Sequence, residues 1–480
     1  MESKLLDKVG GFIGGQWITE VPGGSFDVIN PATGVLLARL PNMGAAETVT
    51  AIVAAERSLR PDVPVPERRR WLETLHDRLL AVKEDFARII TCENGKPLKE
   101  AVVEVEYACG FFRFFAAQLH RLESEIVPGR MRNCEWTVHH RPAGVAGLIA
   151  PWNFPLAMMG KKVAAALASG CGAVIKPARQ TPLSMIALCH LAEQVGVPAG
   201  RLNVVVGRAG PIGETLCTHP SVRIISFTGS TEIGEWLATK SAPRLKRLTL
   251  ELGGNAPFIV FEDANLQVAA DALMANKFRV AGQTCVCANR VLVQESVAPA
   301  FTALVAERVS KLRVGDGLDP ASDLGPLIDG AQYEKVAAHV RDALQRGARR
   351  IVGSDPAPLV HDWGAFFPPT VLTGVTRDML VCREETFGPV IAIATFASEA
   401  EAVATANETC YGLAAYAFSQ DAARLNRLAA QLQFGHIGFN TGAGPTPEAP
   451  FGGFKRSGFG REGGLAGLLE FCESQVVARA

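Results

Sequence analysis

VAGLIAP, at residues 145–151, opens the part of the chain that decides the fold, because short apolar runs alternate there with amphipathic stretches. Three more runs follow: GAVIKPA (172–178), LNVVVG (202–207) and RIISFTG (223–229). Short apolar runs predict buried strands, and intervening stretches such as PLSMIALCHLAEQVG (182–196) have the pattern of helices. The alternation predicts an α/β fold with a mostly parallel, doubly wound sheet, in which ligands bind at the carboxyl ends of the strands.

The segment before this region is predicted to be helical. Residues 66–90 place leucines and a phenylalanine near a 3.6-residue period with charges between them, and Gly95-Lys96-Pro97 is a helix-ending signal. Residues 98–122 have the spacing of a second amphipathic helix. We therefore expect two helices that precede the parallel strands in the chain.

Three further segments complete the predicted organisation. Residues 124–142, interrupted by Pro128-Gly129, indicate a β-hairpin that stands apart from the helices. A second α/β region begins near residue 251 with ELGGNAPFIVFED and runs to about residue 440. LEFCESQVVARA, at 469–480, predicts a last strand. No repeat or low-complexity linker separates these parts, so we expect interlocked domains.

The composition narrows the possible functions. The chain has 480 residues, which suggests two or three domains. Its 48 basic and 48 acidic residues balance, whereas a protein that binds nucleic-acid phosphates needs a basic excess. No polybasic run is present to attract an anionic membrane. We expect neither nucleic acid nor a membrane as a partner.

The cysteines and the N-terminus indicate the compartment. The 11 cysteines are scattered without regular spacing, unlike a secreted disulfide framework, which favours a reducing environment. Met1 to Gly11 carries charges and no apolar signal segment. A long uncharged stretch, Pro142 to Gly160, is interrupted by prolines and does not suit a membrane helix. These features predict a cytoplasmic protein.

Several signatures of other chemistries are absent from the sequence. It has no GxxxxGK[ST] phosphate loop, no HExxH zinc motif and no GxSxG nucleophile elbow. The nine histidines do not cluster with cysteines, so we expect no metal site. P-loop, zincin and common serine-hydrolase chemistry are thereby excluded.

Cys285 is the candidate nucleophile. It lies in FRVAGQTCVC (278–287), where Gly, Gln and Thr suggest a loop that leaves the thiol within reach. A lone cysteine is more often a small apolar core residue, and only the thiolate is reactive. Cys287, two residues on, could form a C-x-C metal pair, but no second pair completes four ligands.

Asn153 and Glu251 could complete a catalytic set. Two prolines flank Asn153 in PWNFP (151–155), so its amide is either part of a rigid turn or a fixed donor for an oxyanion. Glu251 follows an apolar run and precedes two glycines in LELGG. It is either an exposed carboxylate at a strand end or a buried base with a raised pKa that activates water.

Three further sequence features could bind a ligand. Lys176 and Arg179 end one strand with two cations suited to ribose hydroxyls or a phosphate. FTGSTEIG (227–234) ends another and opens a helix, where a pyrophosphate could bind. EETFGP (384–389) offers a carboxylate for ribose hydroxyls or merely a charge pair at a helix end.

These motifs are weak singly but specific together. In order along the chain they are PWNFP (151–155), VIKPA (174–178), FTGSTEIG (227–234), LELGGNAP (250–257), GQTCVCANR (282–290), EETFGP (384–389) and PFGGFKRSGFGREGG (450–464). With this set, the chain resembles the aldehyde dehydrogenase superfamily from FIGGQW, near residue 12, to its last strand. KFRVAGQTCVCANR and LELGGNAPFIVFEDA are most similar to the succinate-semialdehyde dehydrogenases.

The resemblance implies an aldehyde dehydrogenase-like α/β architecture of three parts. A Rossmann-like nicotinamide-cofactor domain would comprise residues 1–122 and 143–250, and an α/β catalytic domain residues 251–440. A small β arm of residues 123–142 and 465–480 would join subunits into a homodimer or homotetramer, as is usual in the family.

The resemblance also implies a mechanism for a small-molecule aldehyde substrate. Cys285 would attack the aldehyde, Asn153 would hold the oxyanion of the thiohemiacetal, and Glu251 would activate water against the resulting thioester. NADP or NAD would bind along a further set of residues. These are Trp152, Lys176, Ala178, Arg179, Gly207, Gly213, Gly229, Ser230, Leu252, Glu385 and Phe387.

The sequence departs from the family pattern at the cofactor and substrate positions. Arg179 stands where NAD enzymes often carry Glu, which favours the 2′-phosphate of NADP. Succinate-semialdehyde enzymes commonly hold the substrate carboxylate with two arginines and a serine. Arg279 matches one arginine, Lys161 replaces the other, and the serine falls near Pro445-Thr446, so Thr446 is the substrate-binding candidate there.

Several alternatives stay open at this stage. The substrate could be glutarate semialdehyde, another ω-oxo acid or, in a broader aldehyde dehydrogenase, an aldehyde without an acid group. The acyl group could pass to coenzyme A, although Glu251 would then be unnecessary as a base. A non-catalytic protein on this scaffold is the remaining alternative. Cys285 and Cys287 could also form a reversible, strained disulfide, as in some relatives, or Cys287 could be a bystander.

Overall fold

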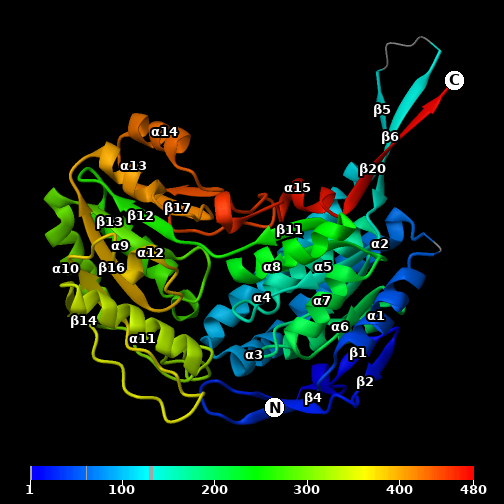
Figure 1. The fold of residues 1–480 in the computed structure, drawn as a ribbon, viewed down its shortest axis with the longest axis horizontal. Coiled ribbons are helices and arrows are strands. Elements are labelled where there is room, and N and C mark those ends of the chain that lie inside the picture. Colours follow the sequence, from blue (N-terminus) through cyan, green and yellow to red (C-terminus); the bar gives the residue numbers. More distant parts are fainter. Residues whose placement is uncertain (1–2, 61, 129–132) are drawn as a thin grey trace.

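The computed structural model describes residues 3–60, 62–128 and 133–480, and its first sheet is built from the alternating region (Figure 1). The sheet has eight strands in the order β19-β11-β10-β7-β8-β9-β1-β2. Its parallel core confirms the predicted α/β fold. The core strands are β7 (Val145–Ile149), β8 (Gly172–Lys176), β9 (Leu202–Val204), β10 (Val222–Thr228) and β11 (Arg247–Glu251). The antiparallel edges are β1 (Gly11–Ile13), β2 (Gln16–Ile18) and β19 (Gly458–Phe459).

Helices connect the parallel strands of this sheet. They are α5 (Ala157–Ser169), α6 (Leu183–Val195), α7 (Ala209–Thr218) and α8 (Thr231–Ser241). Helix α5 is buried at every residue except the partly buried Met158, although it carries Lys161 and Lys162. Two adjacent buried lysines in an otherwise apolar helix need partners, because an unpaired buried charge is costly.

The N-terminal helices pack against the first sheet. They are α1 (Ala45–Arg57), α2 (Val65–Ala81), α3 (Lys83–Asn94) and α4 (Leu98–Gln118). Trp71 and Phe112 are fully buried where α2 and α4 meet. The single helix expected over residues 66–90 is two helices, because Val82 leaves the helical backbone between α2 and α3. The predicted end at Gly95 and the helix over 98–122 are confirmed.

The second sheet is mostly parallel and lies in the other half of the molecule (Figure 1). Its order is β14-β15-β16-β13-β12-β17-β18, with β14 antiparallel. The strands are β12 (Ala256–Val260), β13 (Ala288–Gln294), β14 (Arg349–Val352), β15 (Thr370–Thr373), β16 (Val390–Phe396), β17 (Ala414–Phe418) and β18 (His436–Phe439). The helices are α9 (Leu266–Lys277), α10 (Ala298–Val309), α11 (Gly330–Gln345), α12 (Leu380–Arg383), α13 (Glu399–Asn407) and α14 (Ala422–Gln431).

A three-stranded sheet projects from the half that holds the first sheet (Figure 1). It consists of β5 (Glu125–Val127), β6 (Glu135–Pro142) and β20 (Cys472–Arg479), which follows α15 (Gly464–Leu469). β20 pairs antiparallel with β6 from Cys472 opposite Pro142 to Arg479 opposite Glu135. The predicted hairpin and final strand therefore join in one arm. The expected turn at Pro128-Gly129 falls partly on residues 129–132, outside the described residues.

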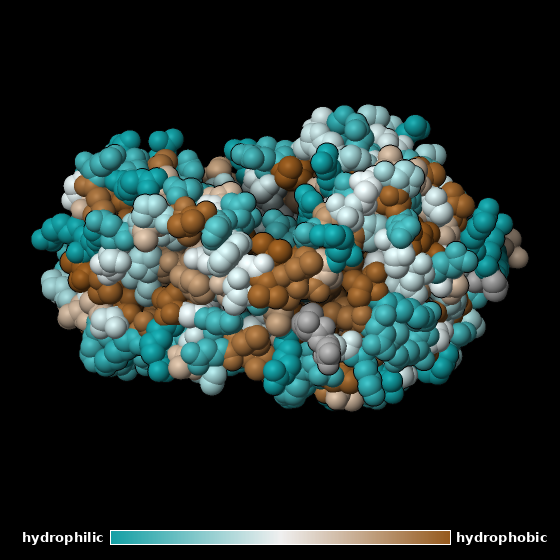
Figure 2. All heavy atoms as spheres, turned by 90° about the horizontal axis from the view of Figure 1, so that it is seen from below, coloured by the Kyte–Doolittle hydropathy of each residue, from teal (hydrophilic) through white to brown (hydrophobic). Residues whose placement is uncertain are grey.

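An N-terminal hairpin links the two halves of the molecule. β3 (Ser25–Ile29) and β4 (Leu36–Pro41) are joined by a turn at which Gly34 lies against the Trp363 ring, and the Gly364 N–H donates to the Pro31 carbonyl at 2.7 Å. Figure 2 views the molecule from below and shows hydrophilic side chains at both ends, with apolar patches across the middle. The hairpin contributes exposed apolar residues, Val35 and Leu36 among them.

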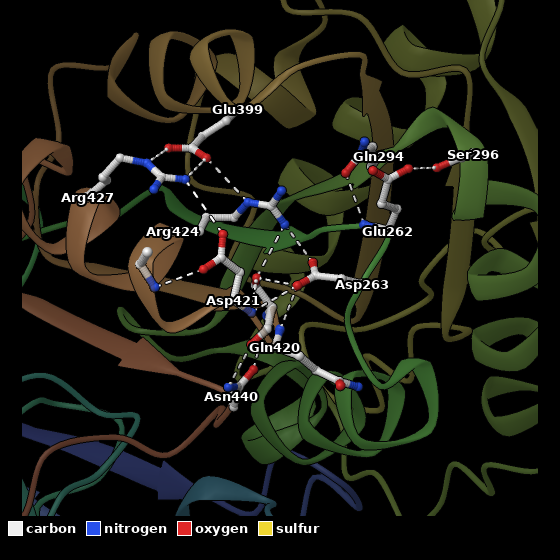
Figure 3. Close-up of polar contacts among 12 residues, drawn as sticks. Glu262, Asp263, Gln294, Ser296, Glu399, Gln420, Asp421, Arg424, Arg427 and Asn440 are labelled. Carbon is white, nitrogen blue, oxygen red and sulfur yellow. Dashed lines mark hydrogen bonds and ion pairs between the residues drawn. The ribbon is translucent and has the colours of Figure 1, made fainter.

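A charged network attaches α14 to the second sheet (Figure 3). The Arg424 guanidinium donates to Asp263, just after β12, at 2.6 Å and to Glu399, the first residue of α13, at 3.3 Å. Arg427 donates to both oxygens of Glu399 at 2.8 and 2.7 Å. We call Asp263, Glu399, Arg424 and Arg427 the surface network. It connects one strand end and two helices.

Two kinds of site are not found in the described parts of the chain. None of their helices combines the length and apolarity needed to cross a membrane. Their His, Cys, Asp and Glu side chains form no group of three or more that could hold a metal ion.

Candidate active site

A cavity of about 830 Å³ lies between the two sheets and gathers most of the predicted site residues. Glu251, the last residue of β11, and Thr228, the last of β10, reach it from the first sheet. Lys161 reaches it from α5, and Cys285 from the loop before β13. Residues far apart in the sequence therefore meet at the carboxyl ends of parallel strands, as doubly wound sheets predict.

Cys285 and Glu251 face one another. The Cys285 thiol is half-buried and lies 3.6 Å from Glu251 Oε1, to which it donates. Burial and the nearby Glu251 charge raise the pKa of the Cys285 thiol well above its usual value. The thiol form is therefore the resting form, and the proton has a carboxylate acceptor close at hand.

The turn that presents Cys285 is backbone-strained. Val280, Ala281 and Gly282 all have positive φ (51°, 52° and 76°), which is unusual for a β-branched residue such as Val280. The Val280 N–H donates to Glu100 Oε2 at 2.7 Å. The buried Gln283 side chain donates to the Val280 carbonyl and accepts from Ile328 N. Such strain clusters where a backbone must hold a functional group in one place.

Asn153 is buried beside this turn. Its Nδ2 donates to the Gln283 carbonyl at 2.9 Å, and its Oδ1 accepts from Phe154 N at 3.1 Å. Its own carbonyl accepts from Lys96 Nζ at 2.6 Å, and that lysine pairs with buried Glu104. One amide hydrogen of Asn153 is therefore engaged next to the Cys285 loop, and the second remains for an oxyanion.

Glu251 belongs to a group of four buried charges, which we call the buried network. Its Oε2 lies 2.6 Å from Lys161 Nζ, and the same ammonium lies 2.5 Å from Glu462 Oε2. Lys162 pairs with the other oxygen of Glu462 and donates to Ser226 at 3.0 Å. Burial raises the pKa of Glu251, and Lys161 opposes this rise. Glu251 is thus a buried carboxylate and not an exposed one at a strand end, which is the surrounding that the predicted base requires.

This network bears on the expectation for Lys161. The sequence placed Lys161 among the substrate ligands, and it does line the cavity. Its ammonium also pairs with two carboxylates of the protein. The structure therefore places Lys161 beside Glu251, and substrate binding by Lys161 stays a prediction.

Arg279 is placed as a substrate ligand would be. It lines the cavity with its guanidinium carbon 5.2 Å from the centre of the Phe154 ring, and its Nε has no hydrogen-bond partner among the described residues. Burial raises the pKa of nearby Glu100, which favours the neutral form of that carboxyl group. Thr446, by contrast, is exposed and outside the cavity lining, whereas Gly444 and Pro445 line it.

Six predicted cofactor residues line the same cavity: Trp152, Gly229, Ser230, Leu252, Glu385 and Phe387. The Trp152 and Phe387 rings meet edge to face at 5.6 Å. A Cβ on Gly229 would lie 2.4 Å from the Phe227 ring, so only glycine fits there. Ser230 caps α8, whose N-terminal amides suit a pyrophosphate.

The other five predicted cofactor residues lie outside that cavity. Lys176 ends β8, Ala178 and Arg179 follow it, Gly207 follows β9, and Gly213 lies in α7. Burial lowers the pKa of Lys176 to about 8, and its Nζ donates to the Pro177 carbonyl. Arg179 is exposed, with its guanidinium carbon 4.7 Å from the Phe26 ring centre. A cation and small residues along strand ends fit an extended dinucleotide.

The Cys287 thiol has partners other than Glu251, the carboxylate that Cys285 contacts. It is buried, its thiol donates to the Gly282 carbonyl at 3.3 Å, and Lys277 Nζ lies 3.6 Å from its sulfur. Both cysteines are free in this structure. A disulfide between them would require Cys287 to leave these contacts.

Sequence reasoning did not identify the second half of the buried network. Glu462 and Lys162 were not among the predicted site residues, yet they complete the charges around Glu251. The signal that could have found Lys162 is the adjacent lysine pair in an apolar helix. Glu462, in the glycine-rich segment GFGREGG, has a weaker signal, because its partners are distant in sequence.

Comparison with known proteins finds relatives along nearly the whole chain. The model of the aldehyde dehydrogenase family matches residues 17–477. The chain is 46% identical to the 3-sulfolactaldehyde dehydrogenase of Pseudomonas putida (99% of this chain, 98% of the relative). It is 46% identical to the NADP-dependent succinate-semialdehyde dehydrogenase GabD of Escherichia coli K12 (97% and 96%). The crystal structure of the Burkholderia pseudomallei succinate-semialdehyde dehydrogenase superposes with a TM-score of 0.97 at 46% identity, covering 100% of this chain and 99% of that one.

Proposed function

The chain belongs to the aldehyde dehydrogenase family and is an NAD(P)-dependent aldehyde dehydrogenase, and from this premise we propose that its substrate is an aldehyde with a terminal acid group. Succinate semialdehyde is the representative substrate, and succinate would be the product. The observation that carries this proposal is Arg279, on the wall of the cavity that holds Cys285, whose Nε has no hydrogen-bond partner among the residues that the structure describes.

The first half of the reaction uses the thiol and the amide. Cys285 gives its proton to Glu251 Oε1, 3.6 Å away, and the sulfur bonds to the aldehyde carbon. The carbonyl oxygen takes up the electron pair as an oxyanion, which the Asn153 amide and the Cys285 N–H stabilise. Residues of the cavity such as Trp152, Leu252 and Glu385 would hold the nicotinamide cofactor, which would supply the hydride acceptor needed to convert the thiohemiacetal on Cys285 to a thioester.

The second half releases the acid. Glu251 first releases the proton of Cys285 to solvent, then removes a proton from a water molecule, and the resulting hydroxide attacks the thioester carbon. The bond between sulfur and carbon breaks and the leaving thiolate takes the proton from Glu251, so the products are the free acid and the Cys285 thiol. A buried base beside the thiol supports water as the acceptor over coenzyme A, because transfer to a thiol cofactor does not require it.

A panel of aldehydes tests the substrate class. Succinate semialdehyde, glutarate semialdehyde and propanal are compared in wild type and in Arg279→Met, with NAD(P)H formation as the readout. We expect the variant to raise KM for the two acids about tenfold or more, because a charged contact is lost, and to leave propanal nearly unchanged. An unchanged KM for the acids would show that Arg279 does not bind the carboxylate.

Glutarate semialdehyde and other ω-oxo acids are the second candidate substrates. Lys161, engaged by two carboxylates, and Thr446, outside the cavity, do not complete the usual ligand set for succinate semialdehyde. The ratio of kcat/KM for the two acids separates these candidates.

NADP is the proposed preferred cofactor because of Arg179. Its guanidinium is exposed at the carboxyl end of β8, where a 2′-phosphate would be attracted and a carboxylate would repel it. Arg179→Glu should lower the kcat/KM ratio of NADP to NAD by about tenfold or more. A strong NAD preference in wild type that this variant leaves unchanged would contradict the assignment.

Assembly, domains and compartment are proposed on structural grounds. The projecting β5–β6–β20 arm, with Ile126 and Val476 exposed, supports a homodimer or homotetramer formed through it. The two large sheets support division into a cofactor domain and a catalytic domain. The 11 free cysteines support a reducing, cytoplasmic location. A reversible disulfide between Cys285 and Cys287 stays a hypothesis, which loss of activity in peroxide and its recovery in dithiothreitol would test.

A further inference from the structure

Lys161 is held in an unusual position for a residue on the wall of a substrate cavity. Its side chain is 4% exposed, and its Nζ contacts Glu251 Oε2 at 2.6 Å and Glu462 Oε2 at 2.5 Å. The rest of α5 around it is buried and mostly apolar. The lysine therefore has protein carboxylates as its nearest charges, on the side of the cavity that holds the base.

The charges of the buried network balance only when both carboxylates are ionised. Lys161 and Lys162 supply two cations, and Glu251 and Glu462 two anions. Burial opposes ionisation of Glu251, as does the negative charge of Glu462, whereas Lys161 favours it. Removal of Lys161 would leave Glu251 with burial and a like charge, both of which favour its protonated form.

Lys161 also orients the Glu251 carboxylate. Oε2 is occupied by the lysine and by the Thr228 hydroxyl at 3.4 Å, while Oε1 faces the Cys285 thiol at 3.6 Å. One oxygen is therefore fixed to the protein and the other is directed at the reacting sulfur. A base with its second oxygen anchored in this way needs little reorganisation before it accepts a proton.

Resting on the proposed function, we propose that Lys161 is a positioning residue that keeps Glu251 ionised and aimed at Cys285, and that it does not bind the acid group of the substrate. The substrate anion is then recognised by Arg279 on another part of the wall. Lysine at position 161 therefore supplies a positive charge beside Glu251 and does not supply a second cation for the substrate.

The other groups around Glu251 bear on any pH effect. They are Lys161 and Lys162 from α5, Tyr107 from α4, Glu462 before α15, Cys285, and the hydroxyl of Thr228 from β10. Burial raises the pKa of Tyr107 to about 12, so it stays neutral near pH 7. Lys161 is the cation in direct contact with Glu251, which makes it the group whose removal should move the acid limb of kcat.

The experiment compares Lys161→Met with Lys161→Arg. For the methionine variant we expect kcat to fall about tenfold or more at pH 7, the acid limb of kcat to move up by at least about one pH unit, and KM for succinate semialdehyde to change less than about threefold. Arginine keeps the charge and should restore most of kcat and the original limb. A KM that rises about tenfold for acids but not for propanal, with kcat and its pH limb unchanged, would overturn the proposal, as would no change at all.

A second background keeps the test decisive if Lys161→Met does not fold alone. The Glu251→Gln variant has a neutral amide at position 251. Adding Lys161→Met then removes one positive charge, and Lys162 and Glu462 remain as an ion pair. A lysine that acts through Glu251 should cost no further kcat in this background. A further loss equal to that in wild type would overturn the proposal. Oxidation of the aldehyde panel by the wild type tests the proposed function separately. The ratio of variant to wild-type kcat is measured with whichever aldehyde the wild type oxidises.

Discussion

The surface network and the buried network contain the same chemistry, two cations and two carboxylates, in opposite surroundings. In the surface network the side chains of Arg424 and Asp263 are 19% and 31% exposed (Figure 3). In the buried network Lys161 and Glu251 are 4% and 3% exposed. Solvent screens the charges of the first network, whereas the charges of the second are buried. Burial of charges is costly, so a buried network that persists beside a nucleophile points to function, whereas an exposed one joins elements.

The use of the carboxylate oxygens also differs between the networks. Asp263 Oδ2 accepts from Ser419 Oγ, Gln420 N and Asp421 N, so its capacity is taken up by the segment that leads into α14. Glu251 keeps Oε1 toward the Cys285 thiol. Hydrogen bonds within the protein occupy the Asp263 carboxylate, whereas Glu251 keeps one oxygen that can react.

The largest expected effect comes from neutralising that reactive carboxylate. Glu251→Gln keeps the size of the side chain but cannot accept a proton, and general base catalysis is worth about 10²–10⁴-fold. We expect kcat for acid formation to fall by that factor. Steady-state assays with succinate semialdehyde measure it, and Glu399→Gln in the surface network is the matched control with wild-type kcat. Equal losses in both variants would remove the functional distinction between the networks.

The candidate catalytic residues could be named from the sequence, because each lies in a local pattern, and the fold brings all three to one cavity. Asn153 is flanked by prolines, Glu251 ends a strand before two glycines, and Cys285 follows a polar loop. The ion pairs of Lys161 could not be predicted, because they join it to Glu251, 90 residues away in the chain, and to Glu462. Only the fold brings those charges together.

In the fold, too, the local sequence predicts individual elements, whereas contacts between distant segments determine how they are joined. The parallel strands follow from short apolar runs, and the pairing of β6 with β20 joins two segments that each have strand patterns. The break at Val82 lacks a proline or glycine signal, so the pattern continued through it. Thr446 was placed by resemblance alone, and the local course of its loop leaves it exposed.

The next largest effect is on stability. Glu462→Gln would leave Lys161 and Lys162 with one carboxylate between them, and breaking a buried pair by removing one partner costs about 3–5 kcal/mol. Burial opposes ionisation of Glu462, but the two lysines outweigh it and hold its pKa well below the ordinary range. Its contribution is therefore present above the ordinary glutamate pKa and is lost as pH falls through the lower folded value.

Urea denaturation at several pH values measures this loss. Wild type should lose stability on acidification more steeply than Glu462→Gln, which has already lost the contribution. Glu399→Gln again serves as the control from the surface network, with a smaller shift of the midpoint. A midpoint for Glu462→Gln that matches wild type at neutral pH would show that the buried charges are not coupled as the distances indicate.

The smallest effect is expected for the surface network itself. Arg424→Met removes ion pairs to Asp263 and Glu399, and a partly exposed ion pair contributes about 0–1 kcal/mol. The methionine keeps apolar contact with the Phe261 ring, over which the guanidinium carbon lies at 4.5 Å. We expect a loss of no more than about 2 kcal/mol in urea denaturation, a smaller loss in 0.5 M salt because screening already weakens the pairs in wild type, and unchanged kcat. A loss as large as that of Glu462→Gln, or one insensitive to salt, would mean that exposure does not separate the two networks.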